Sequence, residues 1–164
     1  MKKILVFVST LDGKITKWGD SPVKKWTSKE DQDYFHKTWV EASIIVEGSS
    51  TFNVAPVKPN PEHHIVVMTR TPSKYKEYEV AGQLEFTDQS PAEIVEQYEK
   101  KGLQQMLVAG GAHIATSFLK ANLIDEVWLT FEPKIFGTGG NFVAEEKLDI
   151  DLQLISVEKV NETG

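Results

Sequence analysis

The chain has 164 residues, of which 40% are hydrophobic and 26% charged, and its formal net charge is −6. This composition predicts one domain, residues 1–164, with a core of its own, and the absence of cysteine excludes disulfides and thiolate metal ligands. The negative charge argues against a nucleic-acid partner, and the short apolar runs argue against a membrane span, so we expect a cytoplasmic protein.

The first predicted strand covers residues 4–8 and leads into a polar loop, residues 9–15, with the sequence STLDGKI. Loops that follow the carboxyl ends of strands bind ligands in open α/β sheets. Lys14 is a candidate contact for a phosphate or hydroxyl group, and Asp12 is a candidate to hold the loop or to accept a proton. The same residues also fit an ordinary Asp-Gly turn with a solvated lysine.

A loop at residues 18–22 precedes a predicted helix that begins after Ser28, a residue type favoured as an N-cap. The helix continues to Trp39. Asp31 lies in its first turn, where the helix dipole favours an acid. Because Asp31 is one turn before Phe35, it is either a solvated capping acid or an acid that faces a cleft beside the apolar side of the helix.

Two further buried strands are predicted at residues 43–47 and 64–68. Gly48 and three hydroxyl residues follow the first of these strands and could cap a short helix. Thr69-Arg70 follows the second strand, and an arginine there could bind an anion through two N–H groups. His63-His64 has no third ligand nearby in the sequence, so no metal site is predicted.

The remaining elements follow from periodicity and capping residues. In chain order we expect a short strand at residues 84–86, a helix from Ser90 to about 101, a strand at 106–109, a helix ending near 121, a strand at 127–131, an antiparallel edge strand at 148–160, and a frayed end at 161–164.

Gly110-Gly111 lies directly between a buried strand and a helix. Glycine lets a ligand approach the backbone closely, and the first N–H groups of the helix are left unpaired. Their partial positive charge suits a phosphate or pyrophosphate. The alternative is a tight turn without a ligand, but the chain repeats the same strand-to-glycine arrangement at Gly48.

Together these segments resemble the dihydrofolate-reductase-like superfamily, and within it the C-terminal reductase domain of the riboflavin-biosynthesis deaminase-reductase and its stand-alone relatives. The resemblance covers nearly the whole chain and implies an α/β fold with a mixed, mostly parallel sheet flanked by helices. Six segments carry it in the family's order: residues 9–15, Ser28–Asp31, Val46–Phe52, Thr69-Arg70, Val108–Ala112, and residues 123–126 through 133–140.

The resemblance implies NADPH bound across the carboxyl edge of the sheet. The paired glycines would bind the pyrophosphate, and Thr69 with Arg70 would bind the adenosine 2′-phosphate, which favours NADPH over NADH. The cofactor-binding residues that the resemblance implies are Ser9, Gly13, Ile15, Gly48, Ser49, Ser50, Thr51, Thr69, Arg70, Gly110, Gly111, Ala112, His113 and Ile114.

For the substrate, the resemblance implies contacts with a small molecule near the same edge. Lys14 matches a lysine that faces the ribosyl substrate, and the glycine-rich segment 137–140 matches a family segment near the site. The implied substrate-binding residues are Lys14, Gly137, Thr138 and Gly139, and the candidate catalytic residues are Asp12, Lys14 and Asp31. Family members of this kind are commonly homodimers.

The chain departs from the riboflavin enzyme in having Ala109 where a glutamate usually precedes the paired glycines, and in lacking a deaminase domain. We expect an NADPH-dependent reductase that transfers a hydride to a C=N or C=O group of a small heterocyclic or sugar-derived substrate. One alternative is a dihydrofolate or pterin reductase, because Asp31 roughly matches the acid on the first helix of those enzymes. Another is a non-catalytic NADPH-binding module, which Ala109 favours.

Overall fold

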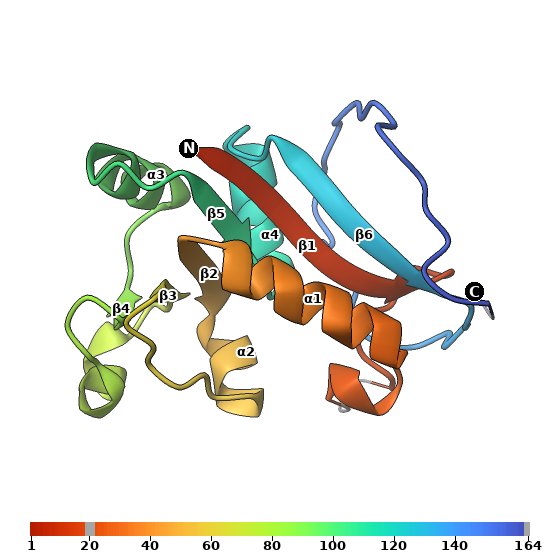
Figure 1. The fold of residues 1–164 in the computed structure, drawn as a ribbon, viewed down its shortest axis with the longest axis horizontal. Coiled ribbons are helices and arrows are strands. Elements are labelled where there is room, and N and C mark those ends of the chain that lie inside the picture. Colours follow the sequence, from red (N-terminus) through yellow and green to blue (C-terminus); the bar gives the residue numbers. More distant parts are fainter. Residues whose placement is uncertain (19–21, 163–164) are drawn as a thin grey trace.

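The computed structural model describes residues 1–18 and 22–162. Six strands form one sheet in the order β4-β3-β2-β5-β1-β6 (Figure 1), and its five pairings are all parallel. The strands are β1 (Lys2–Thr10), β2 (Ile44–Gly48), β3 (His64–Met68), β4 (Leu84–Thr87), β5 (Gln105–Val108) and β6 (Glu126–Glu132). The predicted mostly parallel sheet is confirmed. The loop expected at 18–22 and the end at 161–164 fall partly outside the described residues.

The helices lie between the strands, as the sequence predicts for an α/β fold. They are α1 (Lys29–Glu41), α2 (Ser49–Val54), α3 (Pro91–Lys100) and α4 (Ala112–Lys120), with two short 3₁₀ helices, η1 (Val23–Lys25) and η2 (Pro72–Tyr78), that the sequence did not reveal. The predicted cap of α1 is confirmed, because the Ser28 hydroxyl accepts the Asp31 N–H at 3.3 Å. Ser90 and Glu93 form a capping box at α3.

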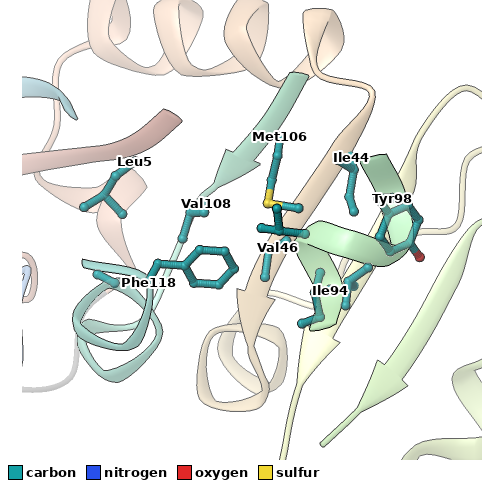
Figure 2. Packing of buried hydrophobic residues seen from close by; sticks show 11 residues of the cluster. Leu5, Ile44, Val46, Ile94, Tyr98, Met106, Val108 and Phe118 are labelled. Atoms are coloured by element: carbon teal, nitrogen blue, oxygen red, sulfur yellow. The ribbon is translucent and has the colours of Figure 1, made fainter. Parts of the chain in front are cut away.

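The core has two layers, one on each face of the sheet. On one face α3 and α4 pack against the strands, and on the other face α1, α2 and η2 do so. Figure 2 shows the first layer, which buries Leu5, Ile44, Val46, Met106 and Val108 of the sheet against Ile94 and Tyr98 of α3 and Phe118 of α4. Side chains alternate between the faces along each strand, so the residue before or after a core residue belongs to the other layer.

The predicted antiparallel strand at residues 148–160 is wrong. This segment has no strand assignment and its large apolar side chains are mostly exposed, as at Leu152 and Val157. Alternation of apolar residues produces a strand only where a neighbouring strand supplies hydrogen-bond partners, and here the segment forms an open loop beside β6 and pairs with no strand of the sheet (Figure 1). Antiparallel pairing occurs among the described residues only as two isolated bridges, Lys14 with Asn141 and Val80 with Leu84.

The parallel arrangement determines where the predicted site residues lie. Since all six strands run in one direction, their carboxyl ends meet at one edge of the sheet. The loops after β1, β2, β3, β5 and β6 therefore gather at this edge. These loops, together with the strand ends beside them and the starts of α2 and α4, carry the predicted site residues outside α1.

Candidate active site

Two glycine junctions meet at the centre of the carboxyl edge. The Gly48 N–H, at the end of β2, donates to the Gly110 carbonyl at 3.2 Å. A Cβ atom on Gly110 would lie 3.1 Å from the Thr51 side chain, and one on Gly48 would lie 3.0 Å from Ile114 Cγ1. The Ile114 and Thr51 side chains thus pack tightly against Gly48 and Gly110, and a larger residue at either glycine would force these side chains to shift.

Gly111 is the N-cap of α4 and has φ = 80°, a left-handed conformation that favours glycine. No side chain of the residues that the structure describes caps this helix. The first helical bond runs from the Ala115 N–H to the Gly111 carbonyl at 3.0 Å, so the N–H groups of residues 112–114 lack helical partners. The cradle formed by Gly48, Thr51, Gly110 and the uncapped start of α4 at Gly111 fits a pyrophosphate, such as that of a nicotinamide dinucleotide.

The loop after β3 lies next to this cradle, because Gly48 of β2 pairs with Met68 of β3. The Thr69 N–H donates to the Thr87 carbonyl at 2.8 Å, and the Thr69 hydroxyl accepts the Thr71 N–H at 3.3 Å. Arg70, between Thr69 and Thr71, is exposed and is the only arginine of the chain. A cation on this side of the cradle has the chemistry to bind a phosphate monoester.

Asp12 clamps the loop after β1 to the loop after β6. Its carboxylate accepts the Thr10 hydroxyl at 2.5 Å and the N–H groups of Phe136 and Gly137 at 3.2 and 2.7 Å. These hydrogen bonds, the one from Thr10 first, lower the pKa of Asp12 to about 2. An acid so strongly held as an anion is suited to fixing the loops, which was one of its two predicted roles. It is too weak a base to be suited to the other role, accepting a proton.

The residues expected to contact the substrate come together through this clamp. Lys14 Nζ donates to Asn141 Oδ1 at 2.8 Å, and the Trp18 N–H donates to the Thr138 carbonyl at 3.3 Å. Gly139 has φ = 147°, and a Cβ atom there would lie only 2.0 Å from the Thr16 carbonyl oxygen. The two loops touch so closely at this point that glycine is required.

Three predicted cofactor residues lie at the end of β1 or in the loop after it: Ser9 is within β1, and Gly13 and Ile15 are in the loop. Ser9 is fully buried, and its hydroxyl donates to the Thr10 carbonyl at 2.7 Å. Gly13 has φ = 77°, and the Ile15 N–H donates to the Gly140 carbonyl at 2.8 Å. Of the remaining predicted cofactor residues, Ser49 is half-buried, while Ser50 and His113 are exposed, at the starts of α2 and α4 respectively.

Asp31 is buried, with 5% of its surface exposed, so it is not the solvated acid that was one of its two predicted roles. It lies in the first turn of α1, on the face of the sheet that α1 covers. Burial raises the pKa of Asp31, and the negative charge of Glu132 adds to the rise, while a hydrogen bond with Thr130 of β6 opposes it. A buried acid that retains its proton can donate it to a ligand.

Sequence reasoning missed four polar groups near Asp31 or on the same face of the sheet. Trp26 is buried and packs edge-on against Phe136 at 5.2 Å, and its Nε1 has no partner in the described part of the chain. Thr130 and Glu132 lie on the face that α1 covers, since they alternate in step with Trp128. The alternation of residues along β6 was visible in the sequence, but the packing of α1 against that strand was not.

The fourth is Glu47, at the carboxyl end of β2. It is 3% exposed, its Oε1 has no partner among the described residues, and burial raises its pKa to about 7. The pairing of Val46 with Val108 places it beside Ala109, whose N–H donates to the Val46 carbonyl at 2.9 Å. The carboxyl that the resemblance leads one to expect at position 109 thus has a counterpart one strand away.

Other features of the described residues do not compete with this edge. A shallow hollow of about 700 Å³ beside β4 is lined by residues such as Lys76, Glu79 and Gln97, and by none of the predicted site residues. No group of three or more His, Asp or Glu side chains in residues 1–18 and 22–162 could bind a metal ion. Across the same residues, no helix has both the length and the apolar character required to span a bilayer.

Solved structures share this architecture. The chain matches a diaminohydroxyphosphoribosylaminopyrimidine deaminase/5-amino-6-(5-phosphoribosylamino)uracil reductase from Thermotoga maritima with a TM-score of 0.71 and 22% identity, over 91% of this chain and 49% of that one. It thus spans about half the length of that protein. A dihydrofolate reductase from Enterococcus faecalis, complexed with NADP(H), matches with a TM-score of 0.63 and 21% identity, over 88% of this chain and 77% of that one. The fold is therefore dihydrofolate-reductase-like.

A family model described as the RibD C-terminal domain matches residues 2–163. The chain therefore belongs to the RibD C-terminal domain family, which confirms the resemblance inferred from the sequence. A relative in Bacillus subtilis (strain 168), the uncharacterized protein YwjB, is 25% identical over 146 residues, which cover 84% of this chain and 80% of that one.

Proposed function

We propose that this protein is an NADPH-dependent reductase that transfers a hydride to a small heterocyclic or sugar-derived substrate, similar to the ribosylaminopyrimidine reductase of riboflavin biosynthesis. The observation that carries the proposal is the cradle of Gly48, Thr51, Gly110 and Gly111 at the uncapped start of α4. Membership of the RibD C-terminal domain family and the reductase neighbours support it.

In this proposal the chain's own residues bind and orient the reactants. The N–H groups of residues 112–114 and the Thr51 hydroxyl bind the pyrophosphate, and Arg70 binds the 2′-phosphate. NADPH, when bound, supplies the hydride. The loop after β1, clamped by Asp12, covers the nicotinamide side and excludes water.

Asp31 is the proposed proton donor. Its buried carboxyl lies on the face of the sheet that α1 covers, and its raised pKa keeps it protonated at a higher pH than an ordinary aspartate. Lys14, beside Asn141 and the glycine-rich loop, is proposed to bind the substrate's ribosyl or phosphate group.

A second candidate is a dihydrofolate or pterin reductase. The observation that favours it is the buried Asp31 on the first helix, hydrogen-bonded with Thr130 of β6. A buried carboxyl of this kind can bind the amino and ring nitrogens of a pterin. The two candidates share the cofactor and differ only in the molecule that accepts the hydride.

The test is an assay of NADPH oxidation with each acceptor, the ribosylaminopyrimidine and dihydrofolate, followed by the loss of nicotinamide absorbance. We expect oxidation with one acceptor and a loss of about 100-fold or more in the D31N variant, typical of a lost general acid. Saturable NADPH binding with no oxidation across these and a panel of carbonyl and imine compounds would refute the reductase and favour the non-catalytic module.

We further propose that residues 1–164 act as a single domain that assembles as a homodimer in the cytoplasm. The exposed apolar side chains of the 148–160 segment and the free edge of β6 support a dimer, because both would be covered in one. Light scattering at increasing protein concentration tests this, and a mass of one chain throughout would contradict it.

A further inference from the structure

Asp31 has a second buried carboxylate beside it. Glu132, at the end of β6, is 4% exposed, and Asp31 is 5% exposed. Glu132 Oε1 accepts the Ser28 N–H at 2.5 Å, and the Ser28 hydroxyl in turn accepts the Asp31 N–H at 3.3 Å. One carboxylate therefore binds the residue that caps the helix on which the other carboxyl lies.

The two carboxyl groups have different partners. Glu132 Oε2 accepts a hydrogen bond from Lys134 Nζ at 3.0 Å, so both its oxygens are bound by donors. Within the described part of the chain, the side-chain hydrogen bonds that influence the Asp31 carboxyl come from the neutral hydroxyls of Thr130 and Thr27. A group bound by an N–H and an ammonium is stabilised as an anion, whereas a desolvated group among hydroxyls is stabilised in its neutral form.

The pKa directions agree with this geometry. Although burial opposes it, the pKa of Glu132 lies below its ordinary value, because Ser28 and Lys134 bind the carboxylate. The pKa of Asp31 lies above its ordinary value, first because it is buried and also because Glu132 is negative. Two acids whose environments drive their pKa values apart form a proton-carrying and an anionic member of a pair.

We propose that Glu132 is a positioning residue for Asp31: its carboxylate fixes the start of α1 and, held as an anion by Ser28 and Lys134, adds to the effect of burial in making Asp31 the proton-carrying member of the pair. The catalytic consequence rests on the proposed function, but the pairing itself does not. Glu132 touches neither cofactor nor substrate in this scheme and acts through Asp31.

Among the charged groups near Asp31, Glu132 has the largest effect on the pKa of the Asp31 carboxyl. From α1 itself, the neighbouring Lys29 and Glu30 are exposed to solvent, where water screens them. From the loop after β6, Lys134 binds Glu132 directly. The β1 residues that pair with Thr130 and Glu132 are Val8 and Thr10, which carry no charge.

The proposal is tested by titrating the Asp31 carboxyl directly, with ¹³C-labelled aspartate in the full-length protein without added ligand, and with D31N used to assign the signal. E132Q keeps an oxygen that can accept the Ser28 N–H but removes the negative charge, so we expect the Asp31 titration to move to lower pH by at least about 0.5 pH unit. K134M leaves the charge of Glu132 unpaired, so we expect the titration to move to higher pH.

The control is K120M. Lys120 is the last residue of α4, which covers the opposite face of the sheet, and it forms an ion pair with Glu146 at 2.7 Å. K120M should therefore leave the Asp31 titration unchanged. Unchanged titration in E132Q, or shifts of the same sign in E132Q and K134M, would overturn the proposal. If E132Q does not fold, K134M decides alone: a shift to higher pH supports the pairing, and no shift or a shift to lower pH refutes it.

The same variants separate this proposal from the proposed function. If the protein oxidises NADPH with an acceptor, the pH midpoint of turnover should move with the carboxyl titration, to lower pH in E132Q and to higher pH in K134M. If no acceptor is reduced but the carboxyl shifts appear, the reductase assignment fails and the pairing stands. If turnover occurs and the carboxyl does not shift, the pairing fails and the reductase stands.

Discussion

Replacing Glu47 by glutamine should make the protein more stable at neutral and alkaline pH. Glu47 is 3% exposed, and its Oε1 has no hydrogen-bond partner among the described residues, so its ionised form is desolvated and poorly compensated. Glutamine has nearly the same shape and cannot ionise. The variant therefore isolates the cost of the negative charge from the cost of packing.

The size and pH range of this effect follow from the pKa of Glu47, which burial raises from 4.5 to about 7. The folded protein then binds the proton more tightly than the unfolded chain does. The contribution of Glu47 to stability is fully present below about pH 4.5 and is lost as the pH rises through about 7. At 1.36 kcal/mol for each pH unit, the loss amounts to about 3 kcal/mol above pH 7.

Urea unfolding, followed by tryptophan fluorescence from pH 4 to pH 8.5, measures this difference. The free energies of unfolding of wild type and E47Q should nearly coincide at pH 4, and E47Q should be more stable by about 3 kcal/mol at pH 8.5. E96Q, at an exposed side chain of α3, controls for the removal of one carboxyl from the chain. A wild-type-to-E47Q difference that stays constant across the range would refute the desolvation argument.

Three further predictions concern the local structure. G139A should destabilise the protein more than G82A, since both glycines have positive φ but only a Cβ on Gly139 meets a carbonyl, and equal thermal shifts would contradict this. S90A should cost about 1 kcal/mol through loss of the capping box at α3, as chemical unfolding can measure. D12N should accelerate hydrogen exchange roughly tenfold at the Phe136 and Gly137 amides, whose N–H groups donate to the Asp12 carboxylate. Unchanged exchange would exclude the role of Asp12 in joining the two loops.

The parts of the fold that depend on local signals could be predicted from the sequence. Buried strands such as residues 64–68 and capped helices such as the one after Ser90 depend on their own residues, so their positions were predicted to within a few residues. The segment 148–160 failed because pairing requires a neighbour, and apolar alternation does not say whether a neighbour is there.

For the candidate site too, features that depend on local sequence could be predicted, and features that depend on tertiary packing could not. The glycine junctions at Gly48 and Gly110-Gly111 were visible as strand-to-helix transitions, and the parallel sheet brings them together. The burial of Asp31 was left open, because it depends on how α1 packs against β6. Glu47 was included in a predicted strand as an ordinary strand end, since its desolvation arises from tertiary packing and has no local signal.

The central claim is that one edge of the sheet binds NADPH, and isothermal titration with NADPH and NADH tests it most directly. We expect saturable binding that favours NADPH, with that preference reduced about tenfold in R70A, as for a lost charge-assisted contact. K74A, which removes a nearby exposed lysine of η2, should leave the preference unchanged. Absence of saturable binding at millimolar NADPH would contradict the account.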